Sequence, residues 1–473
     1  MLIYILLGLL IAMFAAVYIK FNKDIFSPPL LFLLAYIVSV GSAVLNVSRW
    51  NIEMAPVTFA VLLAGAVEFV AIGIAVDMYF TKKSVAISAD CDTSHLVEKP
   101  LIDVAWWKII AVGVISLVYL VLLYINVLDI AGKFGDYSSF SQVLNLFKTA
   151  TSATLTYALP WWLEQTERIL MVCAFVFLYI FMHDISALKK PREKKAVIKE
   201  ISYLVPVAAY FVNGVLMSDR LMIMQTLIAG IIMFFLFWCY RTGKAYISVK
   251  ALLSLAGAAC LGLAVFYISA EFIGRINSKG PIEYITYYCG GSIECLNQFF
   301  KAPPAPSDII GKETFYNFNR KLYDLGLLKL DSFYPIHLEF RYYNDVMLGN
   351  VYTAYRRWIY DFGYVGAFIL QGIMAFAMSW FYNRLKYKRF KNTGFAMVLY
   401  GYLAYTVILH PIDGYLYVQY VSLTFIVTVL LMWLAHWFFV NCRVQFRGGF
   451  TVFFNERWRL EKFRLKKTPQ SEQ

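Results

Sequence analysis

The sequence predicts an all-α polytopic membrane protein with about eleven transmembrane helices. Three observations support this fold class. Hydrophobic residues make up 60% of the 473-residue chain and charged residues only 15%, whereas soluble domains carry roughly 25% charged residues. Apolar runs of roughly 18 to 25 residues recur along the chain, as transmembrane helices require. A transmembrane β-barrel would instead show alternating segments of about ten residues.

The apolar runs divide the chain into one membrane domain, residues 1–440, and a basic tail, residues 441–473. We interpret the first run as an N-terminal anchor rather than a cleaved signal peptide, because basic residues follow it and none precedes it. A long outer-face loop or cap, about 271–357, separates the eighth and ninth helices. The predicted spans are residues 2–19, 30–48, 55–80, 107–128, 169–187, 201–217, 221–240, 250–270, 358–381, 394–410 and 416–440.

The basic residues set the predicted orientation. The 43 Lys and Arg residues give a formal charge of +13, but they are spread over alternate connections and the tail, so we expect no nucleic-acid partner. Under the positive-inside rule these connections are cytoplasmic, which places the N-terminus outside and the C-terminus inside. We expect the basic tail to hold this topology and to contact anionic lipid.

Seven cysteines are scattered along the chain without metal-ligand spacing, and we predict neither a metal site nor another cofactor. Cys289 and Cys295 share the predicted outer loop. Oxidising conditions there would allow a disulfide, and the sequence leaves this pairing open.

Two segments near the predicted outer face combine charge or aromatic residues with apolar runs. Ser218-Asp219-Arg220 forms a tight turn between the sixth and seventh spans. A guanidinium at the membrane surface needs an anionic partner, either Asp219 or a lipid-linked phosphate. Residues 284–297 are aromatic and amphipathic, and they predict a helix at headgroup depth.

A third segment runs from the outer loop into the ninth span, from Asn350-Val-Tyr-Thr353 to Asp361-Phe-Gly-Tyr-Val-Gly366. Arg356, Arg357 and Asp361 each oppose membrane insertion, so they must serve another purpose. Gly363 and Gly366 would allow another helix or an acyl chain to approach closely.

These three segments resemble the Wzy-type oligosaccharide repeat-unit polymerases of bacterial O-antigen, lipopolysaccharide and capsule synthesis. The likeness covers mainly residues 200–385. Its strongest element is Asp361 to Gly366 after Asn350 to Thr353, followed by Arg220 near the outer end of a central span. Histidine is the clearest departure. Related O-antigen ligases place a functional histidine in the large outer loop, where His337 is the candidate here, while His410 competes at the end of the tenth span.

The resemblance implies a glycosyltransferase of the bacterial cytoplasmic (inner) membrane. It would join undecaprenyl-diphosphate-linked oligosaccharides on the outer face by metal-independent inverting transfer, with a chain-length co-polymerase and a flippase as partners. The implied catalytic residues are cationic groups for the leaving diphosphate and candidate general bases; further residues are assigned to substrate binding. The cationic groups are Arg220, Arg356 and Arg357. The candidate general bases are Asp219, His337, Asp361 and His410. The residues assigned to substrate binding are Arg275, Arg341, Asn350, Tyr352 and Glu339, and Glu339 is also a candidate base.

Three alternatives remain open at this point. An O-antigen ligase would perform the same chemistry on a different acceptor. A flippase or exporter of lipid-linked oligosaccharides would favour internal repeats, an even number of helices and no large outer loop. A purely structural membrane protein would leave the outer arginines without a purpose.

Overall fold

The computed structural model describes residues 1–88, 102–153, 156–186, 194–242, 257, 267, 280–343, 346–446 and 450–454. The predicted eighth span, apart from two isolated positions, lies outside these residues, as do Arg275 and the end of the basic tail. The helices are α1 (Leu2–Lys20), α2 (Pro28–Leu45), α3 (Val47–Trp50), α4 (Pro56–Ser88), α5 (Trp106–Phe134), α6 (Phe140–Lys148), η1 (Thr149–Ala153), α7 (Trp161–Ser186), α8 (Lys194–Ser202), α9 (Val205–Leu216), α10 (Arg220–Thr242), α12 (Pro281–Lys301), α13 (Tyr316–Asp324), α14 (Ala354–Lys386), α15 (Thr393–Ile408), α16 (Tyr415–Tyr420), α17 (Leu423–His436) and η2 (Trp437–Asn441).

Strands are short in the described part of the chain. β1 (Arg341–Tyr343) pairs antiparallel with β2 (Val346–Gly349), and β3 (Cys442–Phe446) pairs antiparallel with β4 (Phe450–Phe454). Each pair is a separate two-stranded hairpin. The first hairpin belongs to the predicted outer loop, and the second follows η2.

Eight helices of the described chain are long and apolar enough to cross a membrane: α1, α2, α4, α5, α7, α10, α14, and α17 continued by η2. The predicted class, an α-helical multi-pass membrane protein, is therefore confirmed. Two predicted spans correspond to shorter helices, since α15 has 16 residues and α9 has 12. At 1.5 Å per residue α9 is about 18 Å long, less than a hydrocarbon core of about 30 Å.

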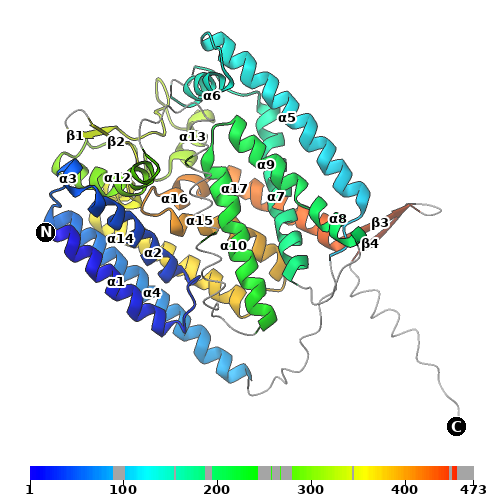
Figure 1. The fold of residues 1–473 in the computed structure, drawn as a ribbon, viewed down its shortest axis with the longest axis horizontal. Coiled ribbons are helices and arrows are strands. Elements are labelled where there is room, and N and C mark those ends of the chain that lie inside the picture. The colour runs from blue at the N-terminus through cyan, green and yellow to red at the C-terminus, as the bar shows by residue number, and fades with distance from the viewer. Residues whose placement is uncertain are drawn as a thin grey trace.

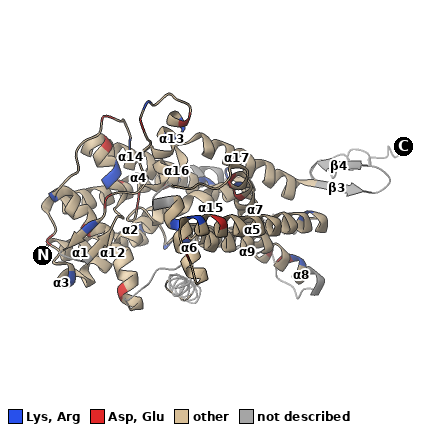
Figure 2. Ribbon diagram, turned by 90° about the horizontal axis from the view of Figure 1, so that it is seen from above, with Lys and Arg blue, Asp and Glu red and all other residues tan. Residues whose placement is uncertain are grey.

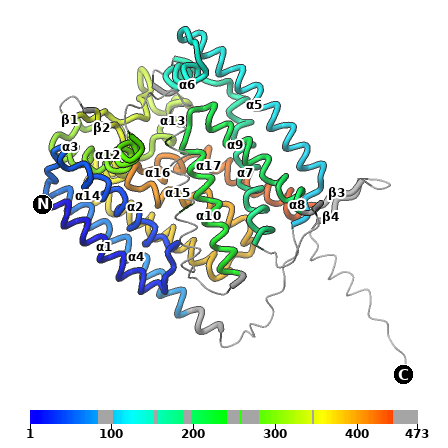
Figure 3. Tube along the Cα trace, in the orientation of Figure 1, coloured from blue at the N-terminus to red at the C-terminus, as the bar shows by residue number. Residues whose placement is uncertain are grey.

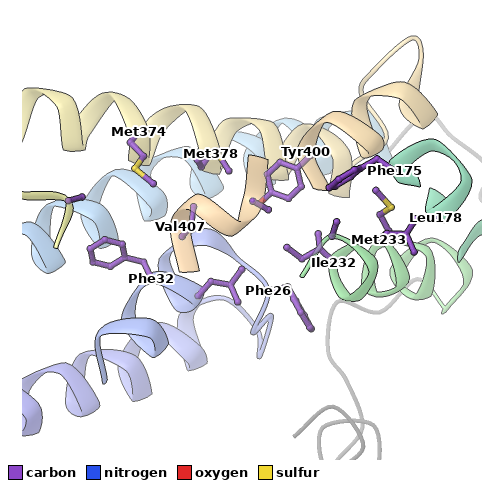
Figure 4. Packing of buried hydrophobic residues seen from close by; sticks show 14 of the residues in the cluster. Phe26, Phe32, Phe175, Leu178, Ile232, Met233, Met374, Met378, Tyr400 and Val407 are labelled. Atoms are coloured by element: carbon purple, nitrogen blue, oxygen red, sulfur yellow. The ribbon is translucent and has the colours of Figure 1, made fainter. Parts of the chain in front are cut away.

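The helices form two groups joined by α15 (Figures 1 and 3). One group contains α1, α2, α4 and α14, and the other contains α5, α7, α9 and α10. Helix α15 packs against α2 and α14 on one side and against α7 and α10 on the other. Figure 4 shows side chains of these elements meeting in one core, among them Phe32, Phe175, Met233, Met374 and Tyr400.

The outer surface of the bundle is apolar, as lipid contact requires. Helix α5 exposes Ile110, Val114, Leu117 and Val121. Charged residues are sparse along the helices (Figure 2). The N-terminus and α3 lie at the same end of the bundle as α12 and the β1–β2 hairpin (Figure 1).

Helix α12 packs against α2, α4 and β2. Asn297 accepts hydrogen bonds from Ala55 N at 2.8 Å and from Thr58 Oγ1 at 2.9 Å. A Cβ atom on Gly290 would lie 2.5 Å from Ala43 N of α2. Only glycine allows the two helices to approach this closely, so the small residues of 284–297 serve helix packing.

The same helix excludes the disulfide that the sequence left open. Cys289 and Cys295 are both free, and both lie within α12. Six positions along a helix correspond to a rise of about 9 Å, whereas disulfide-linked Cα atoms lie at most about 7 Å apart. The Cys295 thiol is instead 3.7 Å from the carbonyl oxygen of Gly349.

Helix α14 is interrupted at Gly363, where φ is 66° and ψ is −172°. A Cβ atom there would meet nothing within 4 Å, so no other helix of the described chain packs closely against this glycine. Its role is conformational, because residues with a side chain rarely adopt this positive φ. The break separates the segment that carries Arg356 and Arg357 from the long apolar part of the helix.

The last predicted span, 416–440, is also divided. Ser422 adopts an extended conformation between α16 and α17, and its hydroxyl accepts a hydrogen bond from Phe425 N. This is the usual arrangement at a helix N-cap. The division leaves α16 as a short helix beside the turn that contains His410 and Asp413.

Candidate active site

Arg356 and Arg357 begin α14 and are both buried in ion pairs. Arg356 is 0% exposed, and its Nη1 and Nη2 lie 2.6 Å from Glu313 Oε2 and 2.9 Å from Glu339 Oε2. Arg357 donates from Nε and Nη2 to the two carboxylate oxygens of Asp413, at 2.6 and 2.9 Å. Buried guanidinium groups require such partners. The two arginines therefore hold together the start of α14, two segments of the connection between α12 and α14, and the turn after α15.

Asp361 fixes the position of Glu313 rather than facing open space. Its carboxylate accepts hydrogen bonds from Glu313 N at 3.0 Å and from Thr314 N at 2.6 Å. It lies one helical turn beyond Arg357 on the same segment of α14. Asp361, a candidate general base in the sequence analysis, therefore holds the backbone of Glu313 and Thr314 in place.

A cavity of about 150 Å³ opens beside these ion pairs. Its wall combines carboxylates, cations and aromatic rings. The Tyr334 ring is stacked on Phe333 at 4.2 Å and meets Tyr316 edge-on at 5.7 Å. The lining residues are Lys312, Glu313, Tyr316, Tyr334, Pro335, Ile336, His337, Leu338, Glu339 and Arg357.

Arg341 and Tyr352 support the Glu339 side of the cavity. Arg341 donates to Tyr352 Oη at 3.0 Å and to Glu339 Oε1 at 3.1 Å, and the Tyr352 hydroxyl donates to the Glu339 carbonyl at 3.0 Å. Asn350 is half-buried in the bend after β2. The structure therefore brings Arg341, Tyr352 and Glu339 together, as a shared site requires.

The two carboxylates on Arg356 have different proton affinities. Burial raises the pKa of Glu313 to about 7, against the opposing attraction of Arg356 and Arg357. Burial also acts on Glu339, but the attraction of Arg356 and further hydrogen bonds outweigh it and lower its pKa. The Glu339 side chain is 36% exposed, compared with 13% for Glu313. Near neutral pH, Glu339 is ionised and Glu313 can exchange a proton.

Arg220 belongs to a second group of contacts, against α12. It donates to Tyr284 Oη at 2.9 Å and to Tyr288 Oη at 3.2 Å, and its guanidinium carbon lies 5.2 Å from the Tyr288 ring centroid. Asp219 accepts a hydrogen bond from Leu221 N at 2.9 Å, at the start of α10. These bonds fix the orientation of the Arg220 guanidinium against α12.

The two candidate histidines lie in different surroundings. His337 is exposed and lines the cavity. His410 is 1% exposed, and its Nδ1 shares a hydrogen bond with Tyr36 Oη at 2.8 Å. Its carbonyl accepts a hydrogen bond from Ala354 N at 3.0 Å. His410 therefore anchors the start of α14. Because its side chain is buried, it is a poor candidate for catalytic contact with a substrate.

Sequence reasoning missed Glu313 and did not assign a role to Asp413. Glu313 is 43 residues from its partner Arg356, and Asp413 is 56 residues from Arg357. The one local signal for Glu313 is its place between a Pro-rich stretch and an aromatic segment of the outer loop.

Comparison with protein-family models, curated proteins and solved structures found no match to this chain.

Proposed function

We propose that this chain is a membrane glycosyltransferase that polymerises lipid-diphosphate-linked oligosaccharide repeat units on the outer face of a bacterial cytoplasmic membrane. The donor would be an undecaprenyl-diphosphate oligosaccharide, and the acceptor a second carrier-linked repeat unit. The proposed topology has about eleven spans, an outer N-terminus, and the cap formed by α12, α13 and the β1–β2 hairpin on the outer side.

One observation carries this proposal: a cavity with a carboxylate of raised pKa lies against two buried arginines where the aromatic cap meets the start of α14. Glycosyl transfer from a lipid diphosphate needs cations near the leaving group and a base near the acceptor. Aromatic rings such as Tyr316 and Tyr334 provide apolar faces for sugar rings. The cavity offers a candidate base and aromatic faces, and the two arginines beside it set its field.

The ion pairs refine the roles of the arginines. Arg356 and Arg357 are committed to Glu313, Glu339 and Asp413, so we assign them to shaping the cavity and setting its field. Arg220, whose guanidinium Tyr284 and Tyr288 orient, is the preferred ligand of the diphosphate because a planar guanidinium matches phosphate oxygens. A chain-length co-polymerase and a flippase are proposed partners in the same membrane.

The first test is the lipid-linked glycan pattern of cells that lack the gene, resolved on a gel and compared with complemented cells. Polymerase function predicts single repeat units displayed outside in the deletion strain and a restored ladder on complementation. Loss of all surface glycan with units on the cytoplasmic leaflet would indicate a flippase instead. Long polymer accumulating on its carrier would indicate a ligase.

A further inference from the structure

Transfer to a sugar hydroxyl requires a base with an accessible lone pair near the acceptor. Asp361 uses both carboxylate oxygens to accept backbone N–H groups. Glu339 accepts from Arg341 at Oε1 and from Arg356 at both oxygens. These hydrogen bonds help to lower the pKa of Glu339. Burial raises the pKa of Asp361, but both of its oxygens are occupied and it is not among the residues that line the cavity.

Glu313 has a different environment. Its Oε2 accepts one hydrogen bond from Arg356, while within the described chain its Oε1 accepts none. The Glu313 side chain lines the cavity. Its carboxylate oxygens are not among the buried polar atoms that lack a hydrogen-bond partner. Asp361 holds the Glu313 backbone from the other side. The geometry thus directs one carboxylate oxygen of a firmly held residue to the cavity.

The cavity suits one sugar ring better than a lipid diphosphate. Its volume of about 150 Å³ equals that of roughly five water molecules and is below the range of about 300 to 1,000 Å³ for drug-sized ligands. Two carboxylates, Glu313 and Glu339, line it together with Lys312 and Arg357. This mixture provides donors and acceptors for hydroxyl groups but no excess of positive charge for a diphosphate.

We propose that this cavity binds the acceptor sugar and that Glu313 is the general base that takes the proton of its hydroxyl. The inference rests on the proposed polymerase function. In the step, the acceptor oxygen forms a bond to the anomeric carbon of the donor while the bond from that carbon to the diphosphate oxygen breaks. The diphosphate leaves with the bonding electron pair, the acceptor proton passes to Glu313, and Glu313 then releases it to water.

Glu313→Gln is the decisive variant because glutamine preserves the volume and can still accept a hydrogen bond from Arg356. The assay uses the full-length protein in lipid nanodiscs with an undecaprenyl-diphosphate-linked repeat unit as donor and acceptor, from pH 5.5 to 8.5. Asp308→Asn is the matched control, an exposed carboxylate of the same outer-loop segment. His337→Asn tests the competing base in the same cavity.

We expect the wild-type turnover to rise with pH through about 7, as the pKa of Glu313 requires. Glu313→Gln should lower kcat by about 100-fold or more, leave KM within about threefold, and remove the pH dependence of the residual rate. Asp308→Asn should retain the wild-type profile. Size-exclusion profiles of all variants in detergent verify that they are folded.

Two results would overturn the assignment. Wild-type-like turnover of Glu313→Gln would exclude its role as a base, and a large loss confined to His337→Asn would transfer that role to His337. Failure of the proposed function gives a different result, because the wild-type protein would then be inactive on every lipid-linked repeat unit tested, and the inference would fail with it.

Discussion

Arg356 and Arg357 are neighbours in the sequence but stabilise different parts of the molecule. Arg356 connects α14 to Glu313 and Glu339 in the segment between α12 and α14, and Arg357 connects it to Asp413 after α15. Each guanidinium is almost fully enclosed, with side-chain exposures of 1% and 4%. Removing either one leaves a carboxylate in a poorly solvated position, so stability and activity should change together.

Arg357→Ala should abolish long glycan and destabilise the protein by about 3 kcal/mol, because it leaves Asp413 without its bidentate partner. Arg357→Lys should rescue poorly, since an ammonium cannot reproduce the planar fork. The thermal midpoint in detergent and the glycan gel measure the two effects. The double variant Arg357→Ala/Asp413→Ala should recover stability but not polymer. Normal polymer from Arg357→Ala would contradict the placement of the site.

Glu313 should make stability depend on pH. Its folded-state pKa of about 7 exceeds the ordinary value of 4.5, so folding favours the protonated form, and stability is lost as pH rises from about 4.5 to about 7. Glu313→Gln mimics the protonated form. It should therefore be more stable than wild type at pH 8, by up to the order of 3 kcal/mol, and similar at pH 4.5. Melting curves at both values test this, and an equal or lower midpoint at pH 8 would contradict it.

The position of the site depends on the break in α14 at Gly363. Gly363 adopts φ 66° two residues after Asp361, so the helical segment before it, which carries both arginines, can take a direction of its own. Without this break α14 would be a straight helix. The segment with Arg356 and Arg357 would then continue in the direction of the apolar segment. The motif Asp361-Phe-Gly363 is therefore explained by backbone conformation and by the carboxylate that holds Glu313 in place.

Gly363→Ala should lower both stability and polymer formation, because φ 66° with ψ −172° lies in a region essentially restricted to glycine, which costs other residues about 1 to 3 kcal/mol. Gly326→Ala is a matched control, since Gly326 has φ +71° and, like Gly363, has nothing within 4 Å of an added Cβ. It follows α13 and should cost similar stability without loss of polymer. Equal loss of polymer in the two variants would show that strain alone, and not the direction of the arginine segment, affects activity.

At the scale of the whole molecule, charged residues are concentrated at the ends of an apolar bundle. The cap formed by α12, α13 and β1–β2 lies with the N-terminus at one end (Figure 1). Lys386 lies near the other end of α14, where it pairs with the buried Asp24 at 2.7 Å. This distribution suits a protein that crosses a membrane and carries out its chemistry at one face.

Topology can be tested with single cysteines in a background whose native cysteines are replaced by alanine. Asp308→Cys, in the cap, should react with a membrane-impermeant maleimide in intact cells, because this residue is exposed on the proposed outer face. Lys391→Cys, an exposed position between α14 and α15, should react only after the membrane is permeabilised. The reverse pattern would invert the proposed orientation and move the site to the cytoplasm.

The sequence by itself determined that the chain is a multi-pass helical membrane protein and approximately where most of the described long helices lie. Each apolar run must satisfy its own backbone hydrogen bonds in lipid, and this constraint is local. It also identified Arg356, Arg357, Arg341 and Glu339 as members of a shared region. Tertiary structure alone decided that α12 packs against α2, α4 and β2, that Asp361 holds the Glu313 backbone, and that Glu313 and Asp413 are the partners of the arginines. Those ion pairs join residues 43 and 56 positions apart, and the direction of a long connecting segment depends on packing that no local pattern encodes.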